Sequence, residues 1–448
     1  MRTLILVMVF SFTIYTSYAQ NIEGIVFDAR TNQPIDAVHV YINKSQQGTL
    51  TNTRGKFKIK TTANLSENDT IYFSHINYQK QGLPYVKDKS KYLVYLTPQV
   101  NTLEEIQVVA NKKLKSDIQF NKLTSMKNGR YAFGSVIKDD IIYIIGGDVS
   151  YQVDENLKTL ENNPDISFIE FLNKTRANFS TKMYRGDLLL YNIHSDSWET
   201  SDLNFRKRAN HNINLYGDKI YVLGGKRVSR NGAFEYLDDK IEVLDLKTNT
   251  VIVDDTNPHQ AANFESFLYK DNLIVLGGSI KQKNNGQKVY SNKVHMYNLK
   301  SGLWYDLATM PSAKETRGIL INDKIYTFGG FNKKPLKEIE SFDLISGKWA
   351  REGVLFSDFN KPAITHANNM VYLFENGKLA SFNCITKELK EYSINLFLSA
   401  AELQYADEKL YILGGLKDEN YTLSASDGLY RVDLNEFETT AVNQSAKL

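Results

Sequence analysis

Short apolar strands that end in a pair of glycines recur along most of the chain. Five copies have this form, and a sixth ends in Glu375 and Asn376 where the glycines would stand. The first glycines of the five pairs are Gly146, Gly224, Gly277, Gly329 and Gly414. These positions and Glu375 lie 39 to 78 residues apart, a spacing typical of propellers and solenoids, whose units bury their apolar faces only against one another. The pattern predicts six repeated units.

A second element recurs in phase with the first. An alternating strand that ends in Asp or Asn follows each glycine pair, and an apolar residue comes six positions later in five copies. The strands end at Asn192, Asp245, Asn298, Asp343, Asn383 and Asp433, and the apolar residues are Trp198, Val251, Trp304, Trp349 and Leu389. Asp and Asn side chains favour tight turns. Each unit should therefore hold four antiparallel strands, a to d, and six units make an all-β, six-bladed propeller.

These two elements resemble the Kelch repeat, which has paired glycines, a Tyr in strand b and a Trp in strand d. That family also carries an Arg sixteen residues before the glycines, which Arg130 and Arg208 keep. The other four blades place Ala261, Ala313, Phe359 and Leu398 there. The resemblance covers about residues 117–442 and implies the propeller fold. It implies little about activity, because Kelch propellers include many binding proteins and only a few enzymes.

The first nineteen residues have the pattern of a signal peptide. Arg2 supplies the positive region, Leu4 to Ile14 the apolar core, and Ser17-Tyr18-Ala19 a cleavage site with small residues. We expect cleavage after Ala19 and an exported protein, in the periplasm, on the outer-membrane surface or outside the cell. No later stretch has eighteen consecutive apolar residues, so no spanning helix is expected.

Residues 20–110 form a separate module of alternating strands and polar turns, and 111–116 a linker to the propeller. The order Gly24-x-Val26-x-Asp28 and then Gly55-x-Phe57 resembles the carboxypeptidase-regulatory-like domain, a small β-sandwich. Asn77 departs from that family, which has Gly before the aromatic residue. The module ends in the tail LEEIQVVANKK. In outer-membrane receptors with this domain a similar tail leads to a plug and barrel, whereas here a propeller follows. The resemblance implies a docking or spacing module without catalytic residues.

Composition excludes several classes of function. A net charge of +3 and a pI near 8.4 are too mild to indicate a nucleic-acid partner. The seven histidines form no close-spaced pair suited to zinc, so we expect no metal and no cofactor. The single cysteine, Cys384, is expected to be a buried small apolar residue. The oligomeric state is left open.

The connections between strands b and c are long and variable, whereas the a–b and c–d turns are minimal. Specificity usually resides in such variable loops on a rigid scaffold. Nine cations fall on three adjacent connections: Lys226, Arg227, Arg230, Lys281, Lys283, Lys288, Lys333, Lys334 and Lys337. They predict either a surface that binds an anionic ligand or simply solvated loops.

The inner strands offer a second candidate site, in the propeller channel. Twelve residues before the first glycine position lie Gly134, Asn212, Glu265, Arg317, Ala363 and Glu402. Charged residues there need partners, so Glu265 and Arg317 could form an ion pair between adjacent blades. Alternatively, Glu265 or Glu402 is a general base and Arg317 holds an anionic substrate, which is similar in kind to Kelch mutarotases that act on acidic sugars.

The sequence thus favours an exported binding protein that meets a polysaccharide or an envelope protein through its b–c loops. A mutarotase or another sugar-modifying enzyme that uses Glu265, Arg317 and Glu402 is the alternative. The insertion at 148–187 is expected to cap the b–c face, because it contains an apolar cluster. That cluster is Phe168, Ile169, Phe171 and Leu172.

Two segments compete to complete the last blade. Residues 436–442 follow strand c of blade six directly. Residues 117–126 are built like a strand d, because Phe120 precedes Met126 by the same six residues that separate Trp304 from Met310. We favour the N-terminal segment as the outer strand of blade six.

Overall fold

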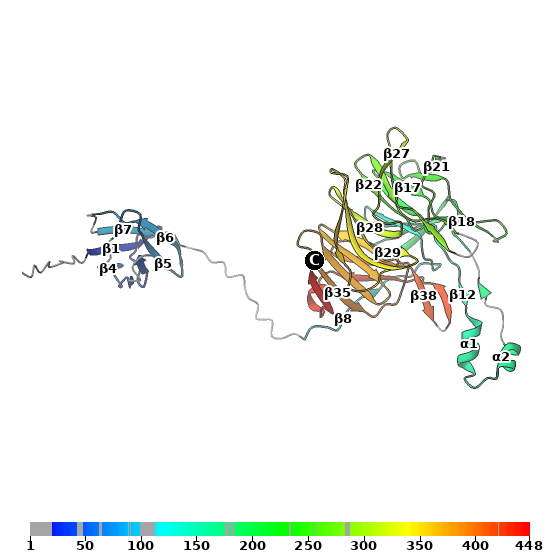
Figure 1. The fold of residues 1–448 in the computed structure, drawn as a ribbon, viewed down its shortest axis with the longest axis horizontal. Coiled ribbons are helices and arrows are strands. Elements are labelled where there is room, and N and C mark those ends of the chain that lie inside the picture. The colour runs from blue at the N-terminus through cyan, green and yellow to red at the C-terminus, as the bar shows by residue number, and fades with distance from the viewer. Residues whose placement is uncertain are drawn as a thin grey trace, which may run out of the picture. The chain divides into compact units, whose positions relative to one another are not determined.

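The computed structural model describes residues 20–448, except 43–47, 62–64, 88, 90, 99–112, 175–178, 181–182, 233, 255, 283–286 and 420. The chain divides into two compact units, residues 1–112 and 113–448 (Figure 1). The predicted signal peptide and most of the segment that joins the two units lie outside the described residues.

The N-terminal unit is a sandwich of two sheets. One sheet has the order β4-β1-β7, and the other has the order β3-β2-β5-β6. The first sheet comprises β1 (Gln20–Asp28), β4 (Lys56–Thr61) and β7 (Lys91–Leu96); the second comprises β2 (His39–Ile42), β3 (Gly48–Leu50), β5 (Thr70–His75) and β6 (Tyr78–Pro84). Alternate residues such as Val26, Val40, Phe57 and Val94 are buried between them. The alternation read from the sequence therefore gives the predicted β-sandwich.

The second unit is a propeller of six sheets, each with strand order a-b-c-d. The inner strands a are β10 (Gly134–Lys138), β16 (Asn212–Tyr216), β22 (Glu265–Tyr269), β28 (Glu315–Ile321), β32 (Ala363–Ala367) and β36 (Glu402–Ala406). Strands b are β11 (Ile141–Ile145), β17 (Lys219–Leu223), β23 (Asn272–Leu276), β29 (Lys324–Asn332), β33 (Met370–Glu375) and β37 (Lys409–Leu413). Strands c are β14 (Asp187–Asn192), β20 (Ile241–Asp245), β26 (Lys293–Asn298), β30 (Lys334–Asp343), β34 (Lys378–Asn383) and β40 (Leu429–Asp433). The outer strands of the first five blades are β15 (Ser197–Asn204), β21 (Thr250–Asp254), β27 (Leu303–Thr309), β31 (Lys348–Val354) and β35 (Glu388–Ile394).

The paired glycines are required by the way strand b meets the start of strand a. Gly329 and Gly330 have φ of 54° and 106°, which L side chains rarely adopt. A Cβ on Gly330 would lie 2.1 Å from the carbonyl oxygen of Glu315. The positive φ values and the close approach of the neighbouring backbone together explain why the repeat has glycine at both positions.

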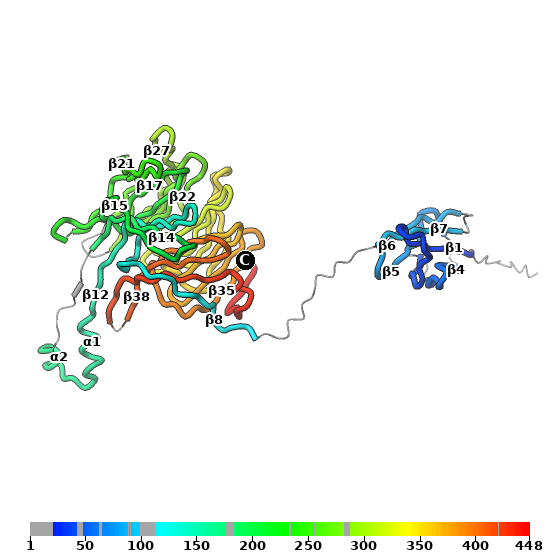
Figure 2. Tube along the Cα trace, turned by 180° about the vertical axis from the view of Figure 1, so that it is seen from behind, coloured from blue at the N-terminus to red at the C-terminus, as the bar shows by residue number. Residues whose placement is uncertain are grey.

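The outer strand of blade six comes from the N-terminal segment, as the sequence favoured. β9 (Asn121–Lys122) pairs antiparallel with β40 and completes that sheet. β8 (Asp117–Ile118), just before it, pairs instead with β35 of blade five. The competing segment is not a strand d, because it forms the short helix α3 (Glu436–Thr439) and then β41 (Gln444–Lys447). β41 also pairs with β35, so both ends of this unit meet blade five (Figure 2).

The 148–187 insertion does not cap the b–c face, and that prediction is wrong. Its helices α1 (Glu155–Asn162) and α2 (Phe168–Lys174) bury no residue and project from the propeller beside β38 (Figure 1). Phe168 and Ile169 are 73% and 72% exposed. The insertion is instead fastened at its base, where β12 (Gln152–Val153) pairs with both β13 (Phe179–Ser180) and β39 (Thr422–Ala425). Backbone pairing with the blade-six connection thus holds the insertion without burial of the apolar residues of its two helices.

Most b–c connections are β-hairpins. Blade two has β18 (Lys226–Val228) and β19 (Glu235–Leu237), blade three has β24 (Ser279–Gln282) and β25 (Lys288–Tyr290), and blade six has β38 (Leu416–Glu419) and β39. In blade four, strands b and c themselves extend to a tip at Lys333. Blade five has only the turn Asn376-Gly377, with both residues at positive φ, a combination typical of tight hairpins. The rim of hairpins is therefore interrupted at blade five.

Candidate functional site

The structure gathers part of the predicted basic surface into one groove. The groove lies between the hairpins of blades two and three and has a volume of about 440 Å³. Three predicted cations line it, namely Lys226, Lys281 and Lys288. Its other lining residues are Glu235, Tyr236, Leu237, Gln260, Ser279 and Ile280. We call this space the hairpin groove. It combines cationic, amide and apolar groups on the predicted binding face.

The remaining predicted cations lie elsewhere on the same loops. Arg230 is exposed at the tip of the blade-two hairpin, and Lys333 and Lys334 are exposed at the tip of blade four. Lys337 donates to the carbonyl oxygen of Phe356, and Lys283 lies outside the described residues.

Several of these cations are neutralised by acids, of which Glu235 lies on the same loops and Glu315 and Asp358 lie outside them. Lys288 Nζ lies 2.8 Å from Glu315 Oε1, and Lys226 Nζ lies 3.8 Å from Glu235 Oε2. Lys337 pairs with Asp358 at 3.3 Å. The positive field of the face is therefore weaker than nine charges would produce, and it is concentrated where lysines stay exposed.

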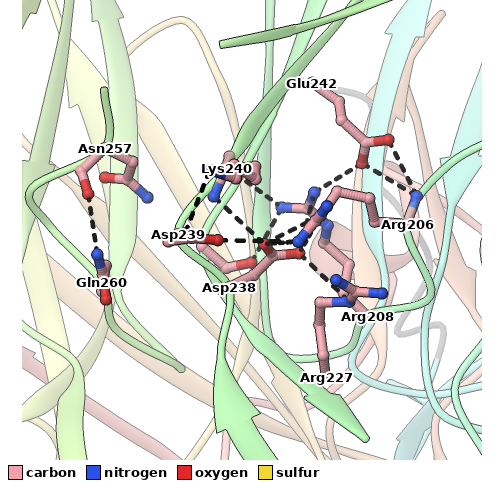
Figure 3. A network of polar contacts seen from close by, with 10 residues as sticks. Arg206, Arg208, Arg227, Asp238, Asp239, Lys240, Glu242, Asn257 and Gln260 are labelled. Carbon is pink, nitrogen blue, oxygen red and sulfur yellow. Dashed lines mark hydrogen bonds and ion pairs between the residues drawn. The ribbon is translucent and has the colours of Figure 1, made fainter. Parts of the chain in front are cut away.

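Arg227 belongs to a structural network at the centre of blade two (Figure 3). The carboxylate of Asp238 is fully buried and lies near three arginines: Arg206 at 3.0 Å, Arg208 at 3.2 Å and Arg227 at 3.8 Å. Arg208 also lies 2.6 Å from Glu242. A buried carboxylate needs such partners, so Arg227 stabilises blade two in addition to lining the face.

The three charged residues that the sequence placed twelve positions before the glycines form one ion triad. Arg317 donates to both oxygens of Glu402, at 3.0 and 2.8 Å, and its Nε lies 3.2 Å from Glu265. Blade four thus reaches blade six as well as its neighbour, blade three, so the triad spans the channel. Burial raises the pKa of Glu265. Burial lowers the pKa of Arg317, but the carboxylates of Glu402 and Glu265 together raise it by more. The guanidinium therefore stays charged.

Above the triad, six equivalent positions surround the opening of the channel. They lie fourteen residues before the first glycine position and are Ala132, Asn210, Asn263, Glu315, Lys361 and Ala400. We call them the mouth ring. The amide of Ala132 donates to Ala400, that of Asn210 to Ala132, and that of Asn263 to Asn210. Sequence reasoning counted twelve residues back from the glycines and missed this ring, although the same count at fourteen would have found Glu315 and Lys361.

The mouth ring opens into a small cavity beside the hairpin groove. Its free volume is about 30 Å³, room for about two or three water molecules. Asn263 donates to Glu315 Oε1 at 3.0 Å, the same oxygen that Lys288 reaches from the groove. Groove and mouth therefore share one polar network on the b–c face.

Other chemistry is sparse in the part of the chain that the structure describes. No group of three or more His, Cys, Asp and Glu side chains is arranged to hold a metal among the described residues. Cys384 is buried, as predicted, and burial raises the pKa of its thiol to about 12. Within the same residues, no helix has the length and apolar character needed to cross a membrane.

Comparison with known proteins identifies both parts of the chain. Residues 177–374 match the KLHDC2/KLHL20/DRC7 Kelch-repeats domain, and residues 22–108 match the CarboxypepD_reg-like domain. The solved structure titled "Structure of YjhT" covers 68% of this chain and 96% of its own, with 12% identity and a TM-score of 0.49.

A curated relative comes from Thlaspi arvense and is named N-(sulfonatooxy)prop-2-enimidothioate sulfolyase. It is 24% identical over 192 residues, which are 39% of this chain and 51% of the relative. The chain thus spans about half the length of that relative. With the two domain matches and the six sheets taken together, the protein carries a carboxypeptidase-regulatory-like β-sandwich followed by a Kelch-repeat β-propeller.

Proposed function

We propose that the protein is an exported binding protein whose propeller recognises an anionic polysaccharide of the cell envelope through the hairpin groove. The observation that carries this proposal is the groove itself, which brings Lys226, Lys281 and Lys288 together beside an aromatic ring. Its volume of about 440 Å³ is that of a site for a small ligand or a short chain segment.

The chemistry of the groove suits an acidic sugar chain. Lys281 is exposed and can pair with a carboxylate or sulfate group. Tyr236 is 46% exposed and Phe234, near the hairpin tip, is 71% exposed, so both offer faces on which sugar rings can pack. An envelope protein with an acidic, apolar surface is the other partner that fits the same groups.

The test is retention of the protein in a gel that contains an acidic polysaccharide such as alginate. Arg230→Glu combined with Lys281→Glu should weaken retention at least about tenfold at low salt, because Lys281 lines the groove and Arg230 is exposed at the tip of a hairpin that borders it. Lys219→Glu with Lys348→Glu makes the same charge change at exposed positions on the opposite, turn-bearing face and serves as the control.

The melting temperatures of both double variants should stay within a few degrees of the parent, since exposed charges contribute little stability. Lys288 is left unchanged because Glu at that position would face the buried Glu315. Equal retention of the two double variants would overturn the polysaccharide proposal, and binding to an acidic protein alone would replace it with the second partner.

The alternative is an enzyme that acts on an acidic sugar in the channel with Glu265, Arg317 and Glu402. The curated relative has an enzyme's name, which keeps this alternative open. A substrate would have to displace Glu402 from Arg317, because the two form a bidentate pair. Nuclear magnetic resonance of anomer exchange in galacturonate tests it. Acceleration that is lost in Arg317→Met would favour the enzyme, whereas the binding protein should leave the exchange rate unchanged.

A further inference from the structure

Lys361 has an unusual environment for a lysine. It lies in the mouth ring, lines the small cavity of the channel and is only partly exposed. The ion pairs of the described residues do not include its amine, although Lys288 and Lys226 are each paired with a glutamate nearby. Its own blade has no b–c hairpin, since only Asn376 and Gly377 join the strands. The amine therefore makes no direct ion pair among the described residues, and no hairpin of blade five covers it.

Glu315 supplies a second unused group in the same cavity. Its side chain is only 2% exposed, and Oε1 accepts from Asn263 and Lys288. Oε2 is buried and has no hydrogen-bond partner among the described residues. Although burial raises the pKa of Glu315, the charges of Lys361 and Lys288 lower it below the ordinary value, so the carboxylate is ionised. Glu315 lines the cavity, and a buried carboxylate oxygen without a hydrogen-bond partner normally requires one.

We propose that Lys361 is a nucleophilic amine that forms an imine with a small aldehyde in the channel mouth, with Glu315 carrying the proton. This activity goes beyond polysaccharide binding and does not depend on it. Desolvation and neighbouring cations are the two conditions that turn a lysine into a nucleophile. Both are present here, in a cavity that admits a molecule of a few heavy atoms.

The protonation of Lys361 supports this assignment. Burial, with smaller contributions from Lys288 and Lys226, lowers its pKa to about 8 against the opposing charge of Glu315. At pH 7.5 about a quarter of such an amine is unprotonated, compared with about 0.1% of an ordinary lysine. The free amine is the reactive form, so this difference favours Lys361 over the exposed lysines of the chain.

The reaction is balanced without any oxidant or reductant. The nitrogen lone pair of Lys361 attacks the carbonyl carbon, and the electrons of the C=O π bond move to the oxygen. Glu315 Oε2 takes one proton from the nitrogen and gives it to that oxygen, which yields a neutral carbinolamine. It then carries the second nitrogen proton to the hydroxyl group, and the C–O bond breaks to release water as the C=N bond forms. Hydrolysis reverses the same steps, so the adduct is reversible until it is reduced.

The test uses the wild-type mature chain. The protein is incubated with glycolaldehyde and sodium cyanoborohydride, which traps the imine as a stable amine, and peptide masses then give the labelling rate at each lysine. Lys361 should be labelled at least about tenfold faster than the exposed Lys281 at pH 7.5, with a rate that rises through a midpoint near pH 8. Equal rates at the two lysines, or a midpoint near that of an ordinary lysine, would overturn the proposal.

Two variants separate the roles of the two residues. Lys361→Arg keeps the charge and should abolish the label at this position. Glu315→Gln should slow labelling of Lys361 at least about fivefold while Lys281 reacts as before. An unchanged rate in Glu315→Gln would overturn the proton-transfer role of Glu315. Circular dichroism of both variants checks the fold, and the wild-type measurement stands even where a variant is unstable.

Discussion

At the scale of single residues, the structure explains the Arg that stands sixteen positions before the glycine pair. Arg130 donates to the carbonyl oxygen of Gly146 at 3.1 Å, and Arg208 donates to that of Gly224 at 3.2 Å. The side chain thus ties the start of strand a to the end of strand b. In blade three, which lacks the Arg, a ring nitrogen of His259 lies 2.9 Å from the Gly277 carbonyl oxygen. The same carbonyl is satisfied by different residue types, so the Arg is structural.

The first prediction concerns Arg208, which is fully buried beside Asp238 and Glu242. Arg208→Met should destabilise the protein by about 3–5 kcal/mol, because it removes the buried guanidinium that pairs with both Asp238 and Glu242. Arg230→Met, at an exposed position, should change stability by less than about 0.5 kcal/mol. Urea unfolding of the two variants checks this, and comparable losses in both would contradict it.

A pH prediction follows from His211. Burial, with a smaller contribution from the charge of Arg208, lowers its pKa to about 3 in the folded protein, from 6.5. Below pH 6.5 His211 binds a proton in the unfolded chain and stays neutral in the folded chain. Stability therefore falls as the pH drops from 6.5 toward 3. His211→Asn should remove about one tenfold change in the folding equilibrium constant per pH unit in that window. Urea midpoints between pH 7 and 5 measure it, and parallel pH profiles for the parent and the variant would show that His211 does not contribute.

Sequence alone reached only part of the channel chemistry. Counting from the glycines placed Glu265, Arg317 and Glu402 on inner strands, and the structure has them there. The sequence reasoning paired Arg317 only with Glu265 of the adjacent blade. It missed the pair with Glu402, because whether a guanidinium reaches across the channel depends on the width of the channel, which the sequence does not give. The lone amine of Lys361 was missed because its surroundings come from three different blades.

At the scale of elements, the alternation of apolar and polar residues and the turn residues predicted the strands well. They did not predict where the inserted segment lies on the propeller. Asp245 and Asp343 accept hydrogen bonds from amides two and three residues ahead, which is the turn mechanism that the pattern implied. The prediction that the 148–187 insertion caps the b–c face was wrong, because it assumed that an apolar cluster must be buried against the propeller. Phe168, Ile169 and Leu172 stay exposed on a short helix whose support is the pairing of β12 with β39.

That arrangement gives a prediction for the insertion. Replacing Phe168, Ile169 and Leu172 together by Ser should leave the melting temperature within a few degrees of the parent, since these side chains are already 58% to 73% exposed. Leu189→Ser, on a buried strand of blade one, is the matched control and should cost several kcal/mol. Differential scanning calorimetry checks both, and a large loss in the triple variant would mean that the insertion packs.

At the scale of the whole propeller, closure depends on a segment that is remote in sequence from the blade it completes. Phe120 packs against Tyr430 at 5.5 Å, and Met126 is buried where blades one and six meet. The spacing that matched Phe120 and Met126 to Trp304 and Met310 carried enough information to predict this. The pairing of β41 with β35 had no such signal, because residues 444–447 match no repeated position.

Closure leads to a prediction about two deletions in the full chain. Removal of residues 111–126 takes away β8, β9 and the buried Met126, and it should abolish cooperative unfolding of the propeller. Removal of residues 436–448 takes away α3 and β41, which lie outside the four strands of blade five, and it should lower the melting temperature while unfolding stays cooperative. Calorimetry distinguishes these outcomes, and the reverse order would refute this account of closure.

The meeting of both ends on blade five has a topological consequence. The amide of Lys115 donates to Thr439, and the amide of Ala441 donates back to Lys115, so the first and last segments of the propeller run side by side. A covalent link between the ends of these two segments would convert this part of the chain into a circle. The cycle could then be opened at any exposed c–d turn, such as Ser346-Gly347, to give a circular permutant that closes its ring within a single blade. In such a permutant, the gene would decide at which turn the chain begins, and the order of the blades in the ring would stay the same.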